Sequence, residues 1–456
     1  MTDTTGKMRT RTKLFYGVGD LGNAVVNSAI QFFLLKFYTD GALIVPALAG
    51  SALLIGKIWD SINDPLMGWI TDRAKSPLGK RRVFMIYGAI PLGISVALVW
   101  FVPPGIGQVL SFAWIALTFA LFGSLWSMTN VPYYALTSEL TDDYDERSSL
   151  TTYRMLLAVP AFLVGAALTP AIVGLFALQR TGWAFIGILY GIICAAALLI
   201  SAAGIRERKV RTAAPGESSP FKSLGLALKN RSFVWLCLTY FVLNLSFSFI
   251  QILMAYYVQY QLLMTAQIPL VMGLLLIIVT ASLPFWRWVS GKMDKGPAYA
   301  IGMGIGALAV VITFFMPHSP TPFIYLISVL AGFGFAGNWI FPWAMVADVA
   351  DFDRLETGQQ RSGMYYGVWG FATKVSQALA LAATGWTLTG FGYVANAAQT
   401  LHALLGIRLF FGIVPAVLIA ASLPFLFLYP ITRKSHTEVR RKLEAMDAAA
   451  GARGQA

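Results

Sequence analysis

The sequence predicts an all-α membrane protein with twelve transmembrane helices in two pseudo-symmetric six-helix bundles. Hydrophobic residues make up 57% of the 456 residues and charged residues only 12%, whereas about 25% of a soluble domain is charged. Apolar runs long enough to cross a bilayer, about 20 residues each, recur along the chain. A polar segment near the middle divides these runs into two equal sets. We therefore expect one integrated helical bundle rather than a series of soluble domains.

Two sets of six apolar runs define the predicted domains. The first set covers residues 14–38, 47–71, 83–102, 109–138, 150–176 and 182–204, and the second covers 233–258, 268–290, 298–316, 322–347, 362–388 and 402–430. The segment between the sets contains a stretch rich in Ala, Pro, Gly and Ser, which is typical of a linker. We predict an N-terminal bundle at 1–205, a cytoplasmic linker at 206–231, a C-terminal bundle at 232–432 and a cytoplasmic tail at 433–456.

Basic residues gather in alternate loops, and this pattern predicts the orientation. They occur at 7–13, 73–82, 206–231, 292–295 and 433–442, whereas the intervening loops hold almost none except Arg180. The positive-inside rule then places both termini in the cytoplasm of a plasma (inner) membrane protein. Because this topology accounts for the net charge of +13, no nucleic-acid partner is expected. The polar, basic start of the chain also lacks the apolar core of a cleaved signal peptide.

The second apolar run carries a polar face. Asp60, Asn63 and Asp64 are three and four residues apart, so they share one face of a helix. Ionisable side chains are costly in hydrocarbon and mark an ion or substrate path. Two carboxylates and an amide oxygen suit Na⁺ or Li⁺, and protonation of one carboxylate would give H⁺ coupling from the same residues. Lys57 lies on this face too, which leaves a second interpretation, a buried salt bridge.

The two halves repeat each other's motifs. Residues 68–73 after the second run resemble residues 291–295 after the eighth, and Asn130-Val131-Pro132 in the fourth run has a counterpart in Phe341-Pro342 of the tenth. Paired halves are typical of a secondary transporter with its site between the repeats. Buried charge in each half favours a carrier over a passive channel. The sequence has no Ser-His-Asp set, His/Cys cluster or glycine-rich phosphate loop, so we expect no enzyme and no cofactor beyond a coupling ion.

Motifs along the whole chain carry a family resemblance. They are YGVGDLG at 16–22, FYTD at 37–40, WDSINDP at 59–65, NVPY at 130–133, and DFD at 351–353 with ETG at 356–358 and Arg361. With them the chain resembles the major facilitator superfamily and, within it, the glycoside–pentoside–hexuronide:cation symporter family, which includes the melibiose carrier. It is also similar to the sodium-dependent lysophospholipid symporters at 131–137 and 153–155. The resemblance implies the major facilitator fold and transport by alternating access.

The resemblance further implies a set of site residues and a function. It implies a cation site at Asp60, Asn63, Asp64 and the Ser127 hydroxyl, taking Na⁺ or alternatively H⁺ or Li⁺. The implied substrate-binding residues are Asn23, Trp126, Asn130, Tyr134, Arg154 and Lys374. The implied function is cation-coupled uptake of a glycoside, hexuronide or related small polar solute by a functional monomer in the bilayer. Symport of a lysophospholipid is the alternative.

The chain departs from the galactoside pattern of this family at the substrate-binding positions. Asn23-Ala24 stands in place of a Lys-Asp pair, Asn130 in place of an aspartate and Tyr134 in place of a stacking tryptophan. The carboxylates that would bind sugar hydroxyls are absent from these positions while the basic residues remain, which favours a substrate with an anionic group. Lys374 has a second interpretation as a structural partner of an aspartate in the N-terminal half, and Arg154 as a side chain that reaches the cytoplasmic surface.

Charged loop residues are expected to form a cytoplasmic gate. They are Asp72, Arg73, Arg81, Arg147, Asp351 and Arg361. Opposite charges at these positions can pair when the inner side is closed and separate when it opens. Surface pairs are individually weak, but several together could favour one state. The sequence assigns no role to Lys36 and Arg408 within apolar runs, nor to His318, His402 and His436.

Overall fold

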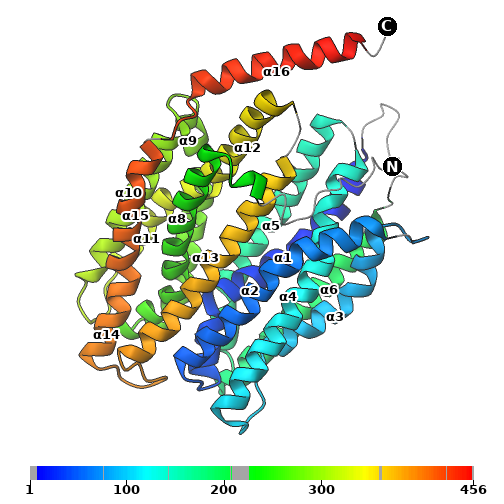
Figure 1. Ribbon diagram of the computed structural model, residues 1–456. Helices are drawn as coiled ribbons and strands as arrows, with labels where there is room; N and C mark the ends of the chain where they lie inside the picture. The colour runs from blue at the N-terminus through cyan, green and yellow to red at the C-terminus, as the bar shows by residue number, and fades with distance from the viewer. Residues whose placement is uncertain are drawn as a thin grey trace.

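The computed structural model describes residues 8–74, 76–141, 143–205, 207, 225–358, 362–427 and 429–453, which form helices and turns and contain no β-strand (Figure 1). The first half contains α1 (Thr10–Lys36), α2 (Pro46–Arg73), α3 (Arg82–Val99), α4 (Gly107–Leu140), α5 (Tyr144–Val173) and α6 (Gln179–Gly204). The second contains α8 (Arg231–Tyr256), α9 (Ile268–Ser290), α10 (Lys295–Phe314), α11 (Phe323–Phe335), α12 (Gly337–Thr357), α13 (Ser362–Gly390), α14 (Leu401–Arg408), α15 (Val414–Phe427) and α16 (Arg433–Arg453). Short π-helical turns continue α1, α8 and α14: η1 (Phe37–Gly41), η2 (Tyr257–Gln261) and η4 (Leu409–Ile413). The predicted all-α fold is confirmed.

Twelve membrane spans emerge when two polar helices are included. Ten segments of the described chain are long and apolar enough to cross a membrane. Apart from the tail helix α16, two long helices are not among these apolar segments, α2 with 28 residues and α13 with 29. They are the helices that carry Asp60, Asp64 and Lys374. The charged residues lower the hydropathy of α2 and α13, which explains why these two helices are not among the apolar segments. The ten segments together with α2 and α13 agree with the predicted twelve-helix architecture.

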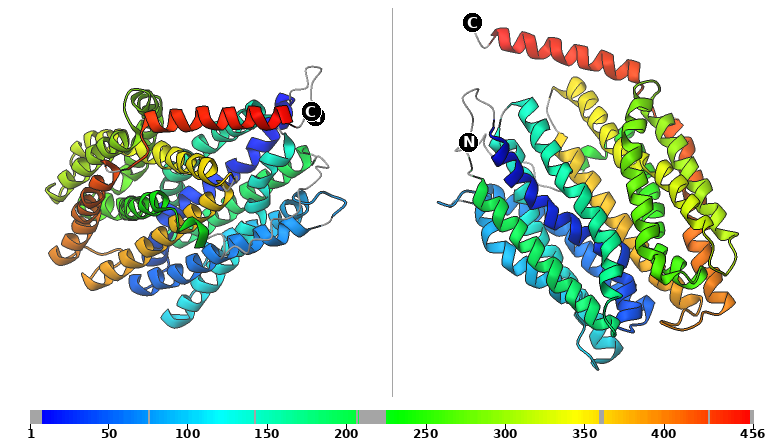
Figure 2. Two further views of the ribbon diagram at one scale, coloured as in Figure 1. Left: turned by 45° about the horizontal axis from the view of Figure 1, so that its top comes forward. Right: turned by 180° about the vertical axis from the view of Figure 1, so that it is seen from behind.

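The helices stand side by side in two groups, α1–α6 and α8–α15 (Figures 1 and 2). Within the groups, α1 packs on α5, α2 on α4, α8 on α13 and α10 on α11. Between the groups, α2 contacts α13, α1 contacts α8 and α5 contacts α9. The described chain begins and ends at one face, here named the terminal face, and α16 lies across it. The other end of the bundle is named the opposite face. Most of the predicted linker 206–231 lies outside the described residues.

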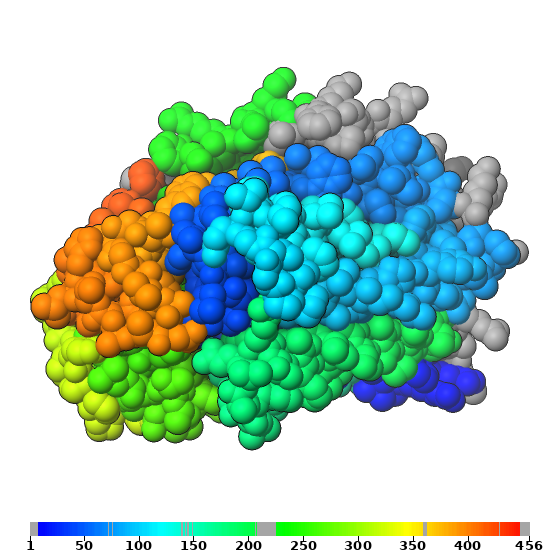
Figure 3. All heavy atoms as spheres, turned by 90° about the horizontal axis from the view of Figure 1, so that it is seen from below, coloured from blue at the N-terminus to red at the C-terminus, as the bar shows by residue number. Residues whose placement is uncertain are grey.

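A close crossing of α2 and α13 joins the two halves near the opposite face. A Cβ on Gly385 would lie 2.3 Å from the carbonyl oxygen of Pro46, and one on Gly50 would lie 2.8 Å from that of Leu381. The Trp386 indole N–H donates to the Ser51 hydroxyl at 2.9 Å. Only glycine permits the backbones to approach this closely. On the opposite face, the surfaces of the two halves meet directly (Figure 3).

Replacing Gly385 by alanine should weaken this crossing. The added methyl group would overlap the Pro46 carbonyl oxygen, and overpacking of this kind costs about 1–3 kcal/mol. We expect the midpoint of thermal unfolding of the purified protein to fall. Gly390→Ala, on the same helix, is the matched control because its Cβ would meet no atom within 4 Å. Equal midpoints for the two variants would contradict the proposed role of the crossing.

Candidate functional site

The predicted cation residues on α2 meet a lysine from the other half of the molecule. The Lys374 Nζ on α13 lies 2.9 Å from Asp60 Oδ2 and 2.6 Å from Asp64 Oδ2. It also contacts the Asp60 carbonyl oxygen at 3.4 Å. Because Asp60 and Asp64 are one helical turn apart, both carboxylates point towards the same partner. The sequence assigned Lys374 to the substrate or, in a second interpretation, to an aspartate of the N-terminal half, and the observed contact agrees with the second.

Helix α4 supplies the hydroxyl group that was predicted to complete the site. The Ser127 hydroxyl donates to Asp64 Oδ1 and lies 3.4 Å from Asp60 Oδ1. Gly123, four residues earlier, lets α4 approach α2, since a Cβ there would lie 2.9 Å from the Asp60 Cβ. The Asn63 amide donates to the Ser124 carbonyl oxygen at 3.4 Å. The structure therefore brings Asp60, Asp64 and Ser127 together and turns the Asn63 amide towards the backbone of α4.

The charges of this cluster balance. Lys57 Nζ lies 3.8 Å from Asp60 Oδ2, so two ammonium groups face two carboxylates. The Lys57, Asp60 and Lys374 side chains are 17%, 8% and 18% exposed, whereas that of Asp64 is 38% exposed. Asp64 is thus the carboxylate with the readiest access from outside the cluster. We name Lys57, Asp60, Asp64, Ser127 and Lys374 the cation cluster.

The donor set of the cation cluster suits a monovalent cation. The Lys374 ammonium, itself a monovalent cation, already touches one oxygen of each carboxylate. The Ser127 hydroxyl oxygen lies beside the other carboxylate oxygens. Carboxylate and hydroxyl oxygens are hard ligands that an alkali ion prefers over nitrogen or sulfur. Asp60, Asp64 and Ser127 would hold Na⁺, and the position of the ammonium group indicates where one positive charge is accommodated.

A second buried ion pair lies between α1, α4 and α5. Arg154 Nε is 3.4 Å from Asp20 Oδ2, and the Tyr134 hydroxyl donates to Asp20 Oδ1 at 3.0 Å. The Arg154 guanidinium carbon also lies 5.1 Å from the centre of the Tyr134 ring, a cation–π distance. Arg154 is therefore paired inside the bundle rather than extended to the surface. Asp20, Tyr134 and Arg154 are named the Asp20 cluster.

One face of α4 joins the two clusters. Ser127 contacts Asp64, Asn130 hydrogen-bonds with Asn23 on α1, and Tyr134 contacts Asp20. These three α4 residues follow a spacing of three and four, so they lie along one stripe of the helix. Of the remaining predicted substrate residues, Trp126 packs on the Phe122 ring with 5.3 Å between ring centres. The predicted residues thus form two polar groups joined through α4.

Near the opposite face, Lys36 and Asp40 form a buried ion pair with a distance of 2.7 Å. The Tyr260 hydroxyl donates to Asp40 Oδ2 at 2.7 Å, and the Tyr393 hydroxyl donates to Asp40 Oδ1. Lys36 and Asp40 belong to α1 and η1, whereas the two tyrosines belong to the other half. The ion pair is thus completed by hydrogen bonds across the boundary between the halves.

Further contacts strengthen this connection. The Asn396 amide donates to the Asp40 carbonyl oxygen at 2.7 Å, and the Thr39 and Tyr256 hydroxyls lie 2.7 Å apart. The Lys36 ammonium lies 4.5 Å from the centre of the Tyr256 ring. We name Lys36, Asp40, Tyr256, Tyr260 and Tyr393 the closing cluster, because they hold the halves together at the opposite face. The structure gives a place to Lys36, which the sequence did not.

The predicted cytoplasmic gate residues have contacts within their own halves. Arg73, Arg81 and Arg147 contact Trp69, Thr71 and Thr141, respectively, and Asp351 lies 3.1 Å from His436 of α16. Arg361 and the Asp72 side chain lie outside the described part of the chain. The gate stays a prediction.

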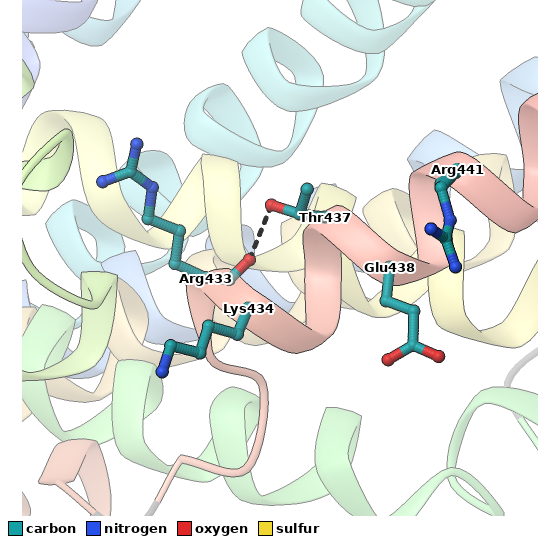
Figure 4. Close-up of a pocket in the computed structure, with 5 residues that line it drawn as sticks. All are labelled: Arg433, Lys434, Thr437, Glu438 and Arg441. Carbon is teal, nitrogen blue, oxygen red and sulfur yellow. Dashed lines mark hydrogen bonds between the residues drawn. The ribbon is translucent and has the colours of Figure 1, made fainter.

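The tail helix α16 is attached to the second half. The Arg433 backbone N–H donates to Asp294 at 2.8 Å, and His436 also lies 3.3 Å from Asp348. Figure 4 shows Arg433, Lys434, Glu438 and Arg441 around a hollow on this helix, with the Thr437 hydroxyl donating to the Arg433 carbonyl oxygen at 2.9 Å. Each residue that lines the hollow belongs to α16, so the hollow is separate from the cation cluster.

Sequence reasoning missed several residues that the structure shows in contact with the predicted ones. Asp20 and Asp40 were part of the family motifs but were not assigned to a site. The signal was available: an aspartate inside an apolar run needs a partner as much as Asp60 does. The partners Tyr260 and Tyr393 carry no comparable signal, because a tyrosine in an apolar run is ordinary.

The comparisons with known proteins identify the family. A family model described as MFS/sugar transport protein matches residues 15–433, and the chain therefore belongs to this family. It is an integral multi-pass membrane protein with the major facilitator fold, and it is a transporter rather than an enzyme. Both conclusions agree with the sequence-based expectations.

Individual relatives cover most of the chain. A protein of Escherichia coli (strain K12) named "Putative sulfoquinovose importer" is 30% identical, over 94% of this chain and 92% of that protein. The sodium-dependent lysophosphatidylcholine symporter 1 of Gallus gallus is 25% identical, over 95% and 89%. A solved bacterial homologue of the human lysosomal transporter Spinster aligns with a TM-score of 0.65 and 13% identity, over 94% and 97%. Relatives named symporters support secondary symport here and imply a coupling cation.

The closing cluster leads to a prediction about stability. Asp40→Asn would leave the Lys36 ammonium buried without its carboxylate, and breaking a buried pair in this way costs about 3–5 kcal/mol. We expect a lower midpoint of thermal unfolding for D40N. The double variant Lys36→Met with Asp40→Asn should regain part of the loss, because no uncompensated charge remains. A double variant less stable than D40N would contradict this account of the pair.

Proposed function

We propose that this protein is a sodium-coupled symporter for a glycoside, hexuronide or related small polar solute. The observation that carries the proposal is the Lys374 ammonium in contact with both Asp60 and Asp64. This contact supports a site that binds one positive charge and in which Na⁺ can replace the Lys374 ammonium group. The family, described as MFS/sugar transport protein, supports a sugar-like solute. The sodium-dependent relative supports Na⁺ as the ion.

Competition between Na⁺ and Lys374 would link the ion to the substrate. With both lysines in place, the two carboxylates are already neutralised. When Na⁺ binds Asp60, Asp64 and Ser127, the Lys374 ammonium is released from its partners. The freed lysine then becomes a hydrogen-bond donor for a substrate between the halves. Coupling in this scheme is a difference in substrate affinity between the two positions of Lys374, as linkage requires.

Alternating access fits the asymmetry of the contacts between the halves. The closing cluster and the Gly385 crossing hold the opposite face together. Towards the terminal face, Gly363, Gly367 and Gly370 lie on the Lys374 side of α13, and a Cβ on each would meet no atom within 4 Å. The basic loops favour a cytoplasmic terminal face. The arrangement would therefore be an inward-facing state of a carrier with bundles at 1–205 and 232–432.

Lysophospholipid symport is the second candidate function. It is favoured by the relative named for lysophosphatidylcholine, which aligns with 95% of this chain. The two candidates share the cation cluster and differ in the solute. A thermal-shift comparison of glycosides, uronides and lysophospholipids, each with and without sodium, distinguishes them, since a ligand that binds the folded state raises its apparent stability.

Removing one carboxylate should abolish the response to sodium. We expect NaCl to raise the unfolding midpoint of the purified wild-type protein relative to choline chloride, and we expect Asp64→Asn to lose this rise. The Asn side chain keeps the shape of Asp64 but not its charge. Glu438→Gln on the exposed part of α16 is the control and should keep the rise. The cation site would be refuted by an unchanged sodium response in both Asp60→Asn and Asp64→Asn.

Removing the Lys374 ammonium group should raise the affinity for sodium, whereas removing a carboxylate should lower it. Lys374→Ala leaves two carboxylates opposite Lys57 alone, so we expect sodium to bind about tenfold more tightly, a change of about 1.4 kcal/mol. The same variant should lose the dependence of substrate binding on sodium. A sodium titration of the unfolding midpoint measures the first effect, and sodium-driven uptake into proteoliposomes measures the second. Wild-type values in both assays would exclude the proposed role of Lys374.

A further inference from the structure

The Asp20 cluster is a candidate for contact with the transported solute. Asp20 is buried on α1, Arg154 comes from α5 and Tyr134 from α4. Tyr134 keeps 43% of its surface exposed, so one edge of the cluster is open. The α4 stripe that ends at Tyr134 begins at Ser127 of the cation cluster. A solute bound at this open edge would therefore lie beside the residues that respond to the cation.

The depth of the Asp20 cluster in the bundle matches that of the cation cluster. At 1.5 Å per residue, Asp20 and Arg154 lie about 15 Å from the terminal-face ends of α1 and α5. By the same measure Asp64 lies about 14 Å from the end of α2, and Lys374 about 18 Å from the start of α13. The two clusters thus occupy one layer of the bundle. A single small solute between the halves could contact both.

The Asp20 cluster offers a hydrogen-bond donor and an acceptor side by side. The Arg154–Asp20 distance of 3.4 Å is long for a charge-assisted hydrogen bond. The buried Arg154 Nε makes no hydrogen bond, and the donor capacity for a solute would come from the other guanidinium N–H groups, since an arginine carries five N–H donors in all. The Asp20 carboxylate accepts one hydrogen bond from Tyr134 and has further acceptor capacity. Such a pair can receive a hydroxyl group that both accepts and donates.

The net charge of the Asp20 cluster is zero, and this determines which solutes it suits. A monoanion that approaches Arg154 also meets Asp20, and like charges at close range cost several kcal/mol. Lys374 cannot offset this repulsion while Asp60 and Asp64 hold it. The expectation of an anionic substrate counted Arg154 and Lys374 as unpaired bases. Both are paired in the structure, so neither is free to attract an anion until sodium releases Lys374.

We propose that Asp20 is a substrate-binding residue that, together with Arg154, selects solutes without net charge, either polyhydroxylated or zwitterionic, over monoanions. Asp20 accepts a hydrogen bond from the solute while Arg154 donates one. The inference rests on the proposed function, because it takes the solute to bind between the halves, and it narrows the proposed solutes to those without net charge, which leaves out the hexuronides. It adds a residue and a charge class that the sequence did not assign.

Two matched pairs of probes test the charge class. One pair is methyl glucoside and methyl glucuronide, and the other is glycerophosphocholine and glycerol 3-phosphate. At pH 7 the members of the first pair differ by one net negative charge and those of the second by about 1.5 to 2, because a phosphate monoester is partly doubly ionised. In sodium-free choline buffer, in which Asp60 and Asp64 hold Lys374, we expect the neutral member of at least one pair to stabilise the purified wild-type protein against thermal unfolding more than its anionic partner does. The pair that responds tells a sugar-like solute from a zwitterionic headgroup.

Asp20→Asn should reverse this preference. Without the carboxylate, Arg154 is an uncompensated cation, so the ratio of anionic to neutral affinity should rise about tenfold or more. The double variant Asp20→Asn with Arg154→Gln lacks both charges and should bind the neutral probe weakly without any gain for the anion. It also covers the case in which D20N alone is too unstable to purify. Glu438→Gln, which removes an exposed carboxylate on α16, should keep the wild-type ratio.

The outcomes separate this inference from the proposed function. Wild-type protein that is stabilised only by the anionic probes, or by none of the four, overturns the charge class. An unchanged ratio in D20N overturns the role of Asp20. In either case the sodium-induced rise in the unfolding midpoint would remain if the symporter proposal is correct. Loss of that rise in the wild-type protein, by contrast, would refute the proposed function itself.

Discussion

The need to balance buried charge at the contact between α2 and α13 is the constraint on which the rest of the structure depends. Two carboxylates on one turn of a membrane helix cannot remain unpaired in hydrocarbon. The protein meets this need with Lys374 from the other half and Lys57 from the same helix. The contact that balances the charge is therefore also a contact between the halves. A monovalent ion that replaced Lys374 would keep the carboxylates balanced but would break this contact between the halves.

Helix α4 extends this constraint to the rest of the polar layer. Ser127, Asn130 and Tyr134 lie on one stripe of α4 but at different heights along the helix. They therefore contact different partners: Asp64 on α2, Asn23 on α1 and Asp20 on α1. A change at the cation cluster would alter the partner of Ser127, and the same helix carries the other two residues. Coupling can thus be read as a property of one helix face, provided that the affinities differ between the two states.

The sequence predicts these features unevenly, for physical reasons. The helical spacing and the cost of buried charge were enough to find Asp60 and Asp64, and the family resemblance pointed to Ser127. The sequence offered Lys374 as a partner of an aspartate in the N-terminal half, but it could not give the contact with both Asp60 and Asp64, because that depends on how α13 crosses α2, which local spacing does not encode. The closing cluster was missed for the same reason: Asp40 is separated from Tyr260 by 220 residues and from Tyr393 by 353. Asp20 could have been found, since its burial required a partner.

The ion pair Lys36–Asp40 lies at the boundary between the halves, whereas the pair Asp20–Arg154 lies within the first half. This difference suggests different roles for the two pairs. Lys36 and Asp40 are completed by tyrosines of the second half, whereas Asp20 and Arg154 both lie in the first half. If the halves move as rigid bodies, the contacts of Asp40 with Tyr260 and Tyr393 must break when the opposite face opens. The Asp20–Arg154 pair can persist through the same motion. A solute held by Asp20 would then keep its contacts in the first half, while the contacts of Lys374 and Asp40 respond to the state of the carrier.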